Sequence, residues 1–145
     1  IDPSVETLLP LLRSQPPFYL TAHIHEKPYL VTQGDTIRLP FLMHGVSPGD
    51  TLRLNRATLL GSRDYTLKAG VPNKELGEKQ KWLDERLFVC RATVMGVESE
   101  PLRIKEKTKR RQRHVRKIKS KHRYTILRVS EVTVNDVDAV KSSSV

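Results

Sequence analysis

Residues 103–123 concentrate the side chains that could do chemistry in this 145-residue chain. The segment contains twelve lysines and arginines but a single acid, Glu106, whereas the rest of the chain carries fourteen cations and fifteen acids. The formal net charge of +10 therefore originates in this one basic run. Because a run of like charges repels itself and cannot be buried, it predicts binding to a polyanion, and nucleic-acid phosphate is the usual one.

The residue types in the basic run suit phosphate recognition. Arginine binds a phosphate through two parallel hydrogen bonds, lysine supplies a compact charge, and histidine can reach a phosphate or stack on a base. Basic residues alternate from Arg103 to Lys109, as on one face of a strand. The predicted nucleic-acid-binding residues of the run are Arg103, Lys105, Lys107, Lys109, Arg110, Arg111, Arg113, His114, Arg116, Lys117, Lys119, Lys121, His122 and Arg123.

Strands are expected on both sides of the basic run, which predicts a long loop or hairpin that projects from the domain. This shape suits insertion between nucleic-acid helices better than wrapping around one strand. Proteins that bind single strands usually interleave aromatic rings with charges. Only Tyr124 borders the run, so structured RNA is the favoured partner. We expect the run to be disordered without RNA, because nothing in it can offset the entropy of ordering.

Three other roles of the basic run are possible alternatives to nucleic-acid binding. A solvated surface would not need so high a charge, whereas a nuclear-localisation segment stays open as an alternative. A membrane-surface or calmodulin-binding segment needs an apolar face, and Val115 and Ile118 do not make one. No apolar run approaches the roughly 18 residues of a membrane span. The sequence therefore predicts neither a membrane nor a small molecule as partner.

Enzymatic chemistry has little support in the sequence. There is no Gly-rich phosphate loop of the required form and no Cys/His metal spacing. His23 and His25 are expected to share one face of a strand, where with Glu26 they could bind a metal, but no further ligand is evident. Surface histidines that touch RNA are the alternative. We predict no enzyme, no cofactor and no metal site.

Cys90 and two aspartates are given structural roles. Cys90 is the one cysteine, so no intrachain disulfide can form, and its alternation with apolar residues predicts packing as a small hydrophobe. Asp35 and Asp50 each follow a glycine at the entry to an expected strand. They are predicted to be turn residues and not an acid/base pair.

Short strands separated by turn residues must position the basic run. About seven of them at close spacing predict a mostly β fold, a small closed or partly closed β-barrel with a long basic loop. The expected strands are residues 18–24, 29–31, 36–39, 51–60, 65–68, 87–95 and 124–129. The expected organisation is an N-terminal extension (1–17), a barrel domain (18–132) with an insertion (73–86) and the basic loop (103–123), and a poorly ordered C-terminal tail (133–145).

The N-terminal extension is predicted to carry a short amphipathic helix. Val5, Leu8, Leu9 and Leu12 fall on one face at helical spacing. Pro10 is expected to kink or break the helix, because it removes a hydrogen bond and crowds the preceding turn. Such an arm could lie against the protein's own core or against a neighbouring protein. In the insertion, Trp82 and Leu83 are expected to pin the polar segment to the body.

Several motifs, in order, resemble the bacterial-type large-subunit ribosomal protein L21 family. The stretch VTQGDTIRL at 31–39 resembles the family's V-S-E-G-D-x-I-x-V, and KAGVP at 68–72 is similar to its K-I-G-x-P. KTKRR at 107–111 resembles K-x-K-R-R-K, and HRYT at 122–125 resembles a shortened G-H-R-x-x-x-T. The resemblance extends over residues 18–132, most of the chain.

This resemblance implies a small β-barrel whose basic loop binds and organises large-subunit ribosomal RNA, beside neighbouring ribosomal proteins. The family's Gly-Gly-Lys-Gln turn is replaced by HEKP at 25–28, where Lys27 keeps a charge that could contact RNA. Lys121 stands where the family has a glycine. The longer ends and the longer insertion resemble those of mitochondrial members of the family. This resemblance implies the large ribosomal subunit of the mitochondrial matrix, with a fungal mitochondrion as one option. A chloroplast origin stays open.

Two functions outside the ribosome stay open at this point. One is a barrel-based DNA- or RNA-binding regulatory module with a basic arm. The other is an RNA-processing enzyme, which would need a catalytic cluster that the sequence does not reveal.

Overall fold

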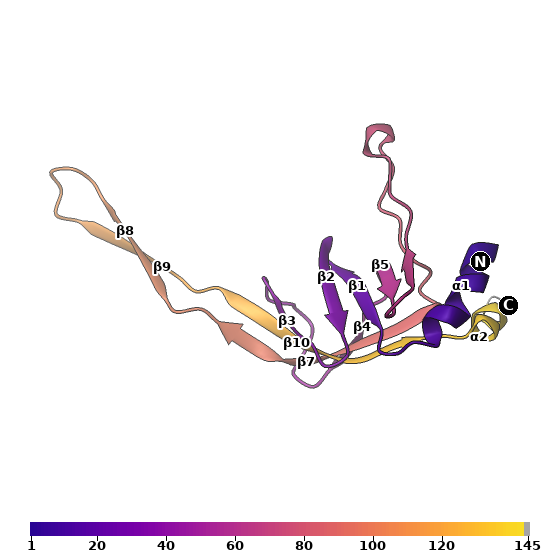
Figure 1. The fold of residues 1–145 in the computed structure, drawn as a ribbon. Helices are drawn as coiled ribbons and strands as arrows, with labels where there is room; N and C mark the ends of the chain where they lie inside the picture. The colour runs from indigo at the N-terminus through magenta and orange to yellow at the C-terminus, as the bar shows by residue number, and fades with distance from the viewer. Residues whose placement is uncertain (144–145) are drawn as a thin grey trace.

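The computed structural model describes residues 1–143 and is mostly β, with a short helix near each end (Figure 1). The helices are α1 (Pro3–Arg13), the 3-10 turn η1 (Lys74–Leu76) and α2 (Val137–Ser142). The strands are β1 (Tyr19–Ile24), β2 (Lys27–Thr32), β3 (Thr36–Leu39), β4 (Thr51–Arg53), β5 (Ala57–Gly61), β6 (Thr66–Lys68), β7 (Phe88–Ser99), β8 (Arg103–Thr108), β9 (Val115–Ser120) and β10 (Arg123–Val134). No helix within residues 1–143 is long and apolar enough to cross a membrane.

Antiparallel strands form two four-stranded sheets and a separate two-stranded ladder. One sheet has the order β2-β1-β5-β6 and the other β3-β10-β7-β4, while β8 pairs only with β9. No ladder of the described residues joins the two larger sheets, so the expected closed barrel is not found. The mostly β architecture is confirmed.

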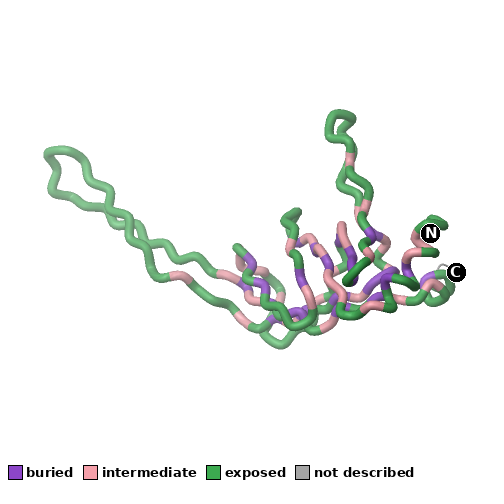
Figure 2. Tube along the Cα trace, viewed as in Figure 1, coloured by how far each residue is buried: buried purple, intermediate pink, exposed green. Residues whose placement is uncertain are grey.

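One apolar core lies in the body of the molecule, and the basic hairpin contributes nothing to it (Figure 2). Buried and partly exposed residues alternate along β1, as expected where one face of a strand is covered. The same alternation along β7 buries Phe88, Cys90 and Ala92. Burial raises the pKa of the Cys90 thiol to about 11, consistent with its predicted role as a small hydrophobe.

The single strand expected over residues 51–60 is wrong. The chain forms β4, which pairs with β7 in one sheet, and then β5, which pairs with β1 in the other. Leu54, Asn55 and Arg56 connect the two strands, and the backbone N–H of Leu54 still donates to the Cys90 carbonyl at 2.9 Å. The alternation of Leu52 and Leu54 with polar residues ends at Asn55 and Arg56, and the single-strand prediction passed over this break.

Two matching turns set the entries to β3 and β4, and both aspartates act as predicted. The Asp35 carboxylate accepts from the Thr32 N–H, and the Asp50 carboxylate accepts from the Ser47 N–H, each at 2.9 Å. The preceding Gly34 and Gly49 have φ of 91° and 94°, which glycine adopts without steric cost. Their N–H groups donate to carbonyls of β10 and β7 at 2.7 Å. These turns hold both loops against the central strand pair.

The two terminal helices pack together at one end of the body (Figure 1). Helix α1 continues through Pro10, contrary to the expected break, because burial of Leu9 and Leu12 stabilises it and only one hydrogen bond is lost. The arm therefore lies against the protein's own core. Asp136 pairs with Arg13, and Glu6 pairs with Lys141 at 3.3 Å.

The prediction of a poorly ordered tail over residues 133–145 is also wrong for most of these residues. Residues up to 134 complete β10, and α2 follows with Val140 only 1% exposed. Apolar contacts with the core give this short helix the stability that its polar sequence does not suggest. Residues 144–145 of the expected tail lie outside the described part of the chain.

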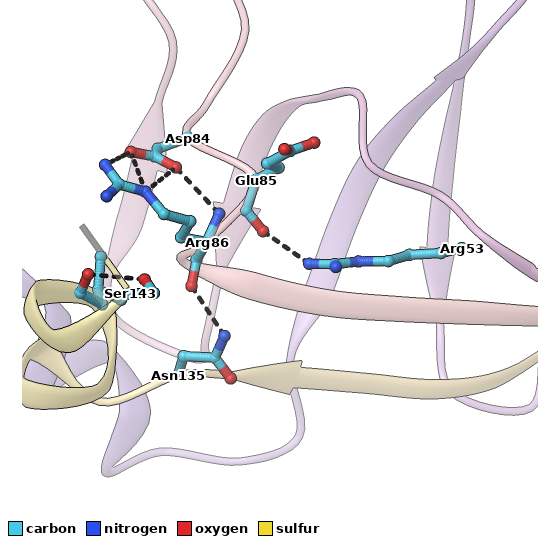
Figure 3. A network of polar contacts seen from close by, with 7 residues as sticks. Arg53, Asp84, Glu85, Arg86, Asn135 and Ser143 are labelled. Carbon is cyan, nitrogen blue, oxygen red and sulfur yellow. Dashed lines mark hydrogen bonds and ion pairs between the residues drawn. The ribbon is translucent and has the colours of Figure 1, made fainter. Parts of the chain in front are cut away.

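The insertion projects from the body and is anchored where it enters β7 (Figure 3). Asp84 and Arg86 form a doubly hydrogen-bonded pair, with a shortest N–O distance of 2.5 Å. The Glu85 and Arg86 carbonyls accept from Arg53 at 3.0 Å and from Asn135 at 2.8 Å. These bonds connect the insertion to β4 and to the end of β10.

Trp82 and Leu83 attach the insertion to the body of the protein, as predicted. Leu83 is 9% exposed, and its N–H donates to the Ala57 carbonyl at 2.8 Å. The Trp82 ring lies edge-on to His23 with 4.8 Å between ring centroids. Beyond this anchor, at the tip around η1, the insertion is exposed (Figure 2).

Helix α1 offers a matched pair of leucines that tests its role in the core. Leu12 is fully buried and neighbouring Leu11 is 49% exposed. We expect Leu12→Ala to lower the free energy of unfolding by about 2–5 kcal/mol, the usual cost of such a cavity. Leu11→Ala should change it by less than about 0.5 kcal/mol. Urea unfolding followed by circular dichroism measures both, and equal effects would show that α1 is not part of the cooperative core.

Candidate nucleic-acid interface

The basic run forms a regular β-hairpin, which we define as β8, β9 and the connecting turn 109–114. Its ladder runs from the pair Arg103/Ser120 to the pair Thr108/Val115. Every residue of both strands is exposed, and the hairpin extends away from the core (Figures 1 and 2). The expected disorder is thus replaced by a ladder, in which β-branched residues such as Ile104 and Val115 favour the extended backbone.

The structure brings together all fourteen predicted residues of the basic run. Arg103, Lys105 and Lys107 lie on β8, while Arg116, Lys117 and Lys119 lie on β9. The turn carries Lys109, Arg110, Arg111, Arg113 and His114, and Lys121, His122 and Arg123 return the chain to the body. All are exposed, so a large ligand can reach each of them. At the turn, Arg111 takes a left-handed φ of 58°, which reverses the chain without a glycine.

Lys27 is the one predicted residue that lies outside the basic run of residues 103–123. It is exposed and begins β2, in the sheet β2-β1-β5-β6, next to the tight turn at His25 and Glu26. It therefore cannot be counted as part of the hairpin surface.

Glu100 anchors the root of the hairpin, and sequence reasoning missed it. Its carboxylate accepts from the Arg103 guanidinium at 2.6 and 2.9 Å and from the His122 N–H at 3.0 Å. Its own N–H donates to the His122 carbonyl at 3.0 Å. The side-chain hydrogen bond from Arg103 is the main cause that lowers the Glu100 pKa, with the His122 N–H adding to it. The sequence signal that could have found Glu100 is an acidic residue three positions before the first arginine of the basic run.

His122 is held against the body. Its ring nitrogen Nε2 donates to the Pro40 carbonyl at 2.7 Å, and its ring lies edge-on to Tyr124 with centroids 4.6 Å apart. The Arg38 guanidinium covers the Tyr124 ring at 4.0 Å and contacts Glu98 at 3.4 Å. This stack occupies the base of the hairpin, so His122 has a structural role whatever it does toward RNA.

The two histidines considered for a metal site do not share a strand face. His23 lies within β1, its ring nitrogen Nε2 is hydrogen-bonded to Thr58 Oγ1 at 2.9 Å, and burial lowers its pKa. His25 lies in the following turn at φ 49° and packs on Phe41 with ring centroids 4.5 Å apart. The tight turn separates the two rings. Within residues 1–143, no three His, Cys, Asp or Glu side chains are placed to hold a metal ion.

Removing the Glu100 charge tests the anchor at the hairpin root. In Glu100→Gln the His122 amide loses a charged acceptor, so we expect its hydrogen exchange to accelerate while amides of β1 stay protected. The folded pKa lies below the ordinary 4.5, so the stabilisation is present above that pH and is lost as pH falls through the folded value.

Glu106→Gln is the matched control, because Glu106 lies on exposed β8 and its carboxylate pairs with Lys117 at 3.7 Å, away from the hairpin root. It should leave exchange of the His122 amide unchanged. Equal exchange in wild type and Glu100→Gln would remove the anchoring role.

Comparison with known proteins identifies the family. Residues 18–132 match the model of the family described as ribosomal prokaryotic L21 protein. The large ribosomal subunit protein bL21m of Neurospora crassa is 54% identical over 140 residues, which cover 97% of this chain and 60% of that protein. The aconitase–ribosomal protein bL21m fusion protein of Schizosaccharomyces pombe is 39% identical over 124 residues, which cover 86% of this chain and 12% of that protein.

The chain thus spans about 60% of the first relative's length and a smaller part of the second. The family match covers both large sheets, the insertion and the whole basic hairpin. With this match and more than half of its residues identical to a relative, the chain belongs to the ribosomal prokaryotic L21 protein family.

Proposed function

We propose that this chain is a structural, non-catalytic constituent of the large ribosomal subunit of a fungal mitochondrion. The family match and the two relatives, a bL21m protein and a bL21m fusion protein, support this role. No cofactor or small-molecule substrate is part of the proposal, because the role needs only binding and positioning. The basic hairpin is its working part.

The observation that carries the proposal is a fully exposed hairpin within the basic run that supplies the positive net charge of the protein. Twelve cations and one acid lie within residues 103–123, and the hairpin strands bury no side chain. Such a surface attracts phosphate and releases counterions from RNA on binding. We infer that the basic run, residues 103–123, contacts large-subunit ribosomal RNA and neutralises closely spaced phosphates, with Lys27 as a separate contact.

The body acts as a rigid mount for this hairpin. We infer that the two large sheets together serve as the small barrel of residues 18–132, since both contribute to one core. The strand pair β7/β10 leaves this core and continues directly into β8 and β9. Rigid elements hold a binding surface more accurately than loops do.

The insertion is a second projecting element, with a different composition. Between Asn73 and Arg86 it carries cations and acids in near balance, and it exposes Leu76 to 76%. A mixed surface of this kind suits contact with a protein better than contact with phosphate. We propose that it meets a neighbouring ribosomal protein.

The turn arginines test whether the hairpin binds RNA. In the variant Arg110→Ala/Arg111→Ala/Arg113→Ala we expect weaker binding to large-subunit RNA, with a salt slope reduced by about 2–3 units, because each lost phosphate contact removes about 0.9. Circular dichroism should be unchanged, since these side chains are exposed.

The insertion supplies a control with the same loss of charge. Lys74→Ala/Lys79→Ala/Lys81→Ala should leave the salt slope of RNA binding unchanged. Unaltered RNA affinity in the arginine variant would show that the turn does not bind RNA, and equal affinity for duplex DNA would favour a regulatory DNA-binding module.

Sedimentation of a mitochondrial lysate tests the assembly. The protein should migrate with the large ribosomal subunit at moderate salt and stay with it at high salt, because many simultaneous contacts hold an integral component. Migration as a small free protein in both gradients would contradict the ribosomal role.

A further inference from the structure

The register of the hairpin sorts its side chains onto two faces. In an antiparallel ladder, directly opposite residues lie on the same face and successive residues alternate. Lys107 is opposite Arg116, whereas Glu106 is opposite Lys117. One face, the charged face, therefore carries Arg103, Lys105, Lys107, Arg116, Ile118 and Ser120. The other, the mixed face, carries Ile104, Glu106, Thr108, Val115, Lys117 and Lys119.

The two faces differ in charge although both belong to one basic segment. The charged face has four cations and no acid, while the mixed face has two cations and one acid. On the mixed face the Glu106 carboxylate lies 3.7 Å from Lys117 Nζ. An approaching phosphate would meet this carboxylate there, and it would meet none on the charged face.

Like charges lie opposite each other only on the charged face. Lys107 and Arg116 form a directly opposed pair, which is destabilising in a free ladder. Within residues 1–143 neither makes an ion pair with an acid, and nor does Lys105. An anion placed over this pair would convert the repulsion into attraction. On the mixed face an anion would relieve no such repulsion, because the opposed charges there, Glu106 and Lys117, have opposite signs.

Arg103 is set apart from the other cations of its face. Its guanidinium is bound by the Glu100 carboxylate at 2.6 Å, so part of its charge is already matched. Lys105 and Lys107 are two residues apart on one strand, about 6.7 Å at the usual rise. With Arg116 on the partner strand, they form a compact triad of cations that are available to phosphate.

We propose that the hairpin ladder binds RNA through its charged face alone, with Lys105, Lys107 and Arg116 on the phosphates and with Lys117 and Lys119 directed away from them. The inference rests on the proposed function and divides the predicted site into contacting and non-contacting cations. The partner is an RNA phosphate ridge that runs along one side of the hairpin.

Two double variants in the same ladder test the proposal. Lys105→Gln/Lys107→Gln and Lys117→Gln/Lys119→Gln remove the same charge from the same residue type, on opposite faces. Binding of large-subunit RNA is measured over a salt series. We expect the first variant to lose about tenfold in affinity and about two units of salt slope, and the second to keep both near wild type.

Hydrogen exchange of the free protein gives a second test, in which two single variants should change the exchange rates of β8 amides in opposite directions. Lys107→Gln removes the opposed like charges, so amides of β8 should exchange more slowly than in wild type. Lys117→Gln removes the complementary pair with Glu106, so the same amides should exchange faster. A variant that simply unfolds the hairpin would be recognised in this measurement.

The outcomes separate this inference from the broader one. Equal losses in both double variants would overturn the one-face proposal and leave RNA binding intact. Normal binding in both, combined with loss in the turn-arginine variant, would also overturn it, because the ladder would not contact RNA. Normal binding in all three variants would remove the proposed RNA-binding function itself.

Discussion

The antiparallel pairing of β7 with β10 is the constraint on which the rest of the structure depends. Its register runs from Phe88/Val134 deep in the body to Ser99/Arg123 at the hairpin root. β3 and β4 add to its two edges, and the glycine turns before them donate back to the same two strands. The core end buries alternating apolar side chains, and the free energy of that burial orients the outer end. Hairpin direction is therefore a consequence of core packing.

Charge is divided along this strand pair. The body is close to neutral and forms ion pairs near its ends, as between Arg13 and Asp136, while the hairpin concentrates cations that its single acid, Glu106, cannot match. Each acid near the hairpin has a defined place: Glu100 fixes the root and Glu106 pairs across the ladder. Together these placements let a strongly basic element extend from a stable domain without destabilising it through self-repulsion.

Most strands and the nature of the basic run could be predicted, because both depend on local patterns. Alternation of apolar residues along Phe88–Ser99 reports which face is buried, and a glycine–aspartate pair before a strand reports a turn. The crossing between β4 and β5 was not predicted, although the alternation ends at Asn55 and Arg56, because which sheet each strand joins depends on pairing partners distant in sequence. Helix α2 was missed because one buried residue, Val140, stabilises it through contacts distant in sequence.

By itself, the sequence determined the family, the mostly β fold and the segment that carries the charge, since composition and short-range periodicity are properties of the chain alone. Only the tertiary structure decided how that charge is used. Strand register divides Lys105 and Lys107 from Lys117 and Lys119, and a carboxylate from outside the run, Glu100, engages Arg103. The reason is physical: a hairpin's faces are defined by which residues lie opposite one another across the ladder, and that pairing exists only once the strands have met.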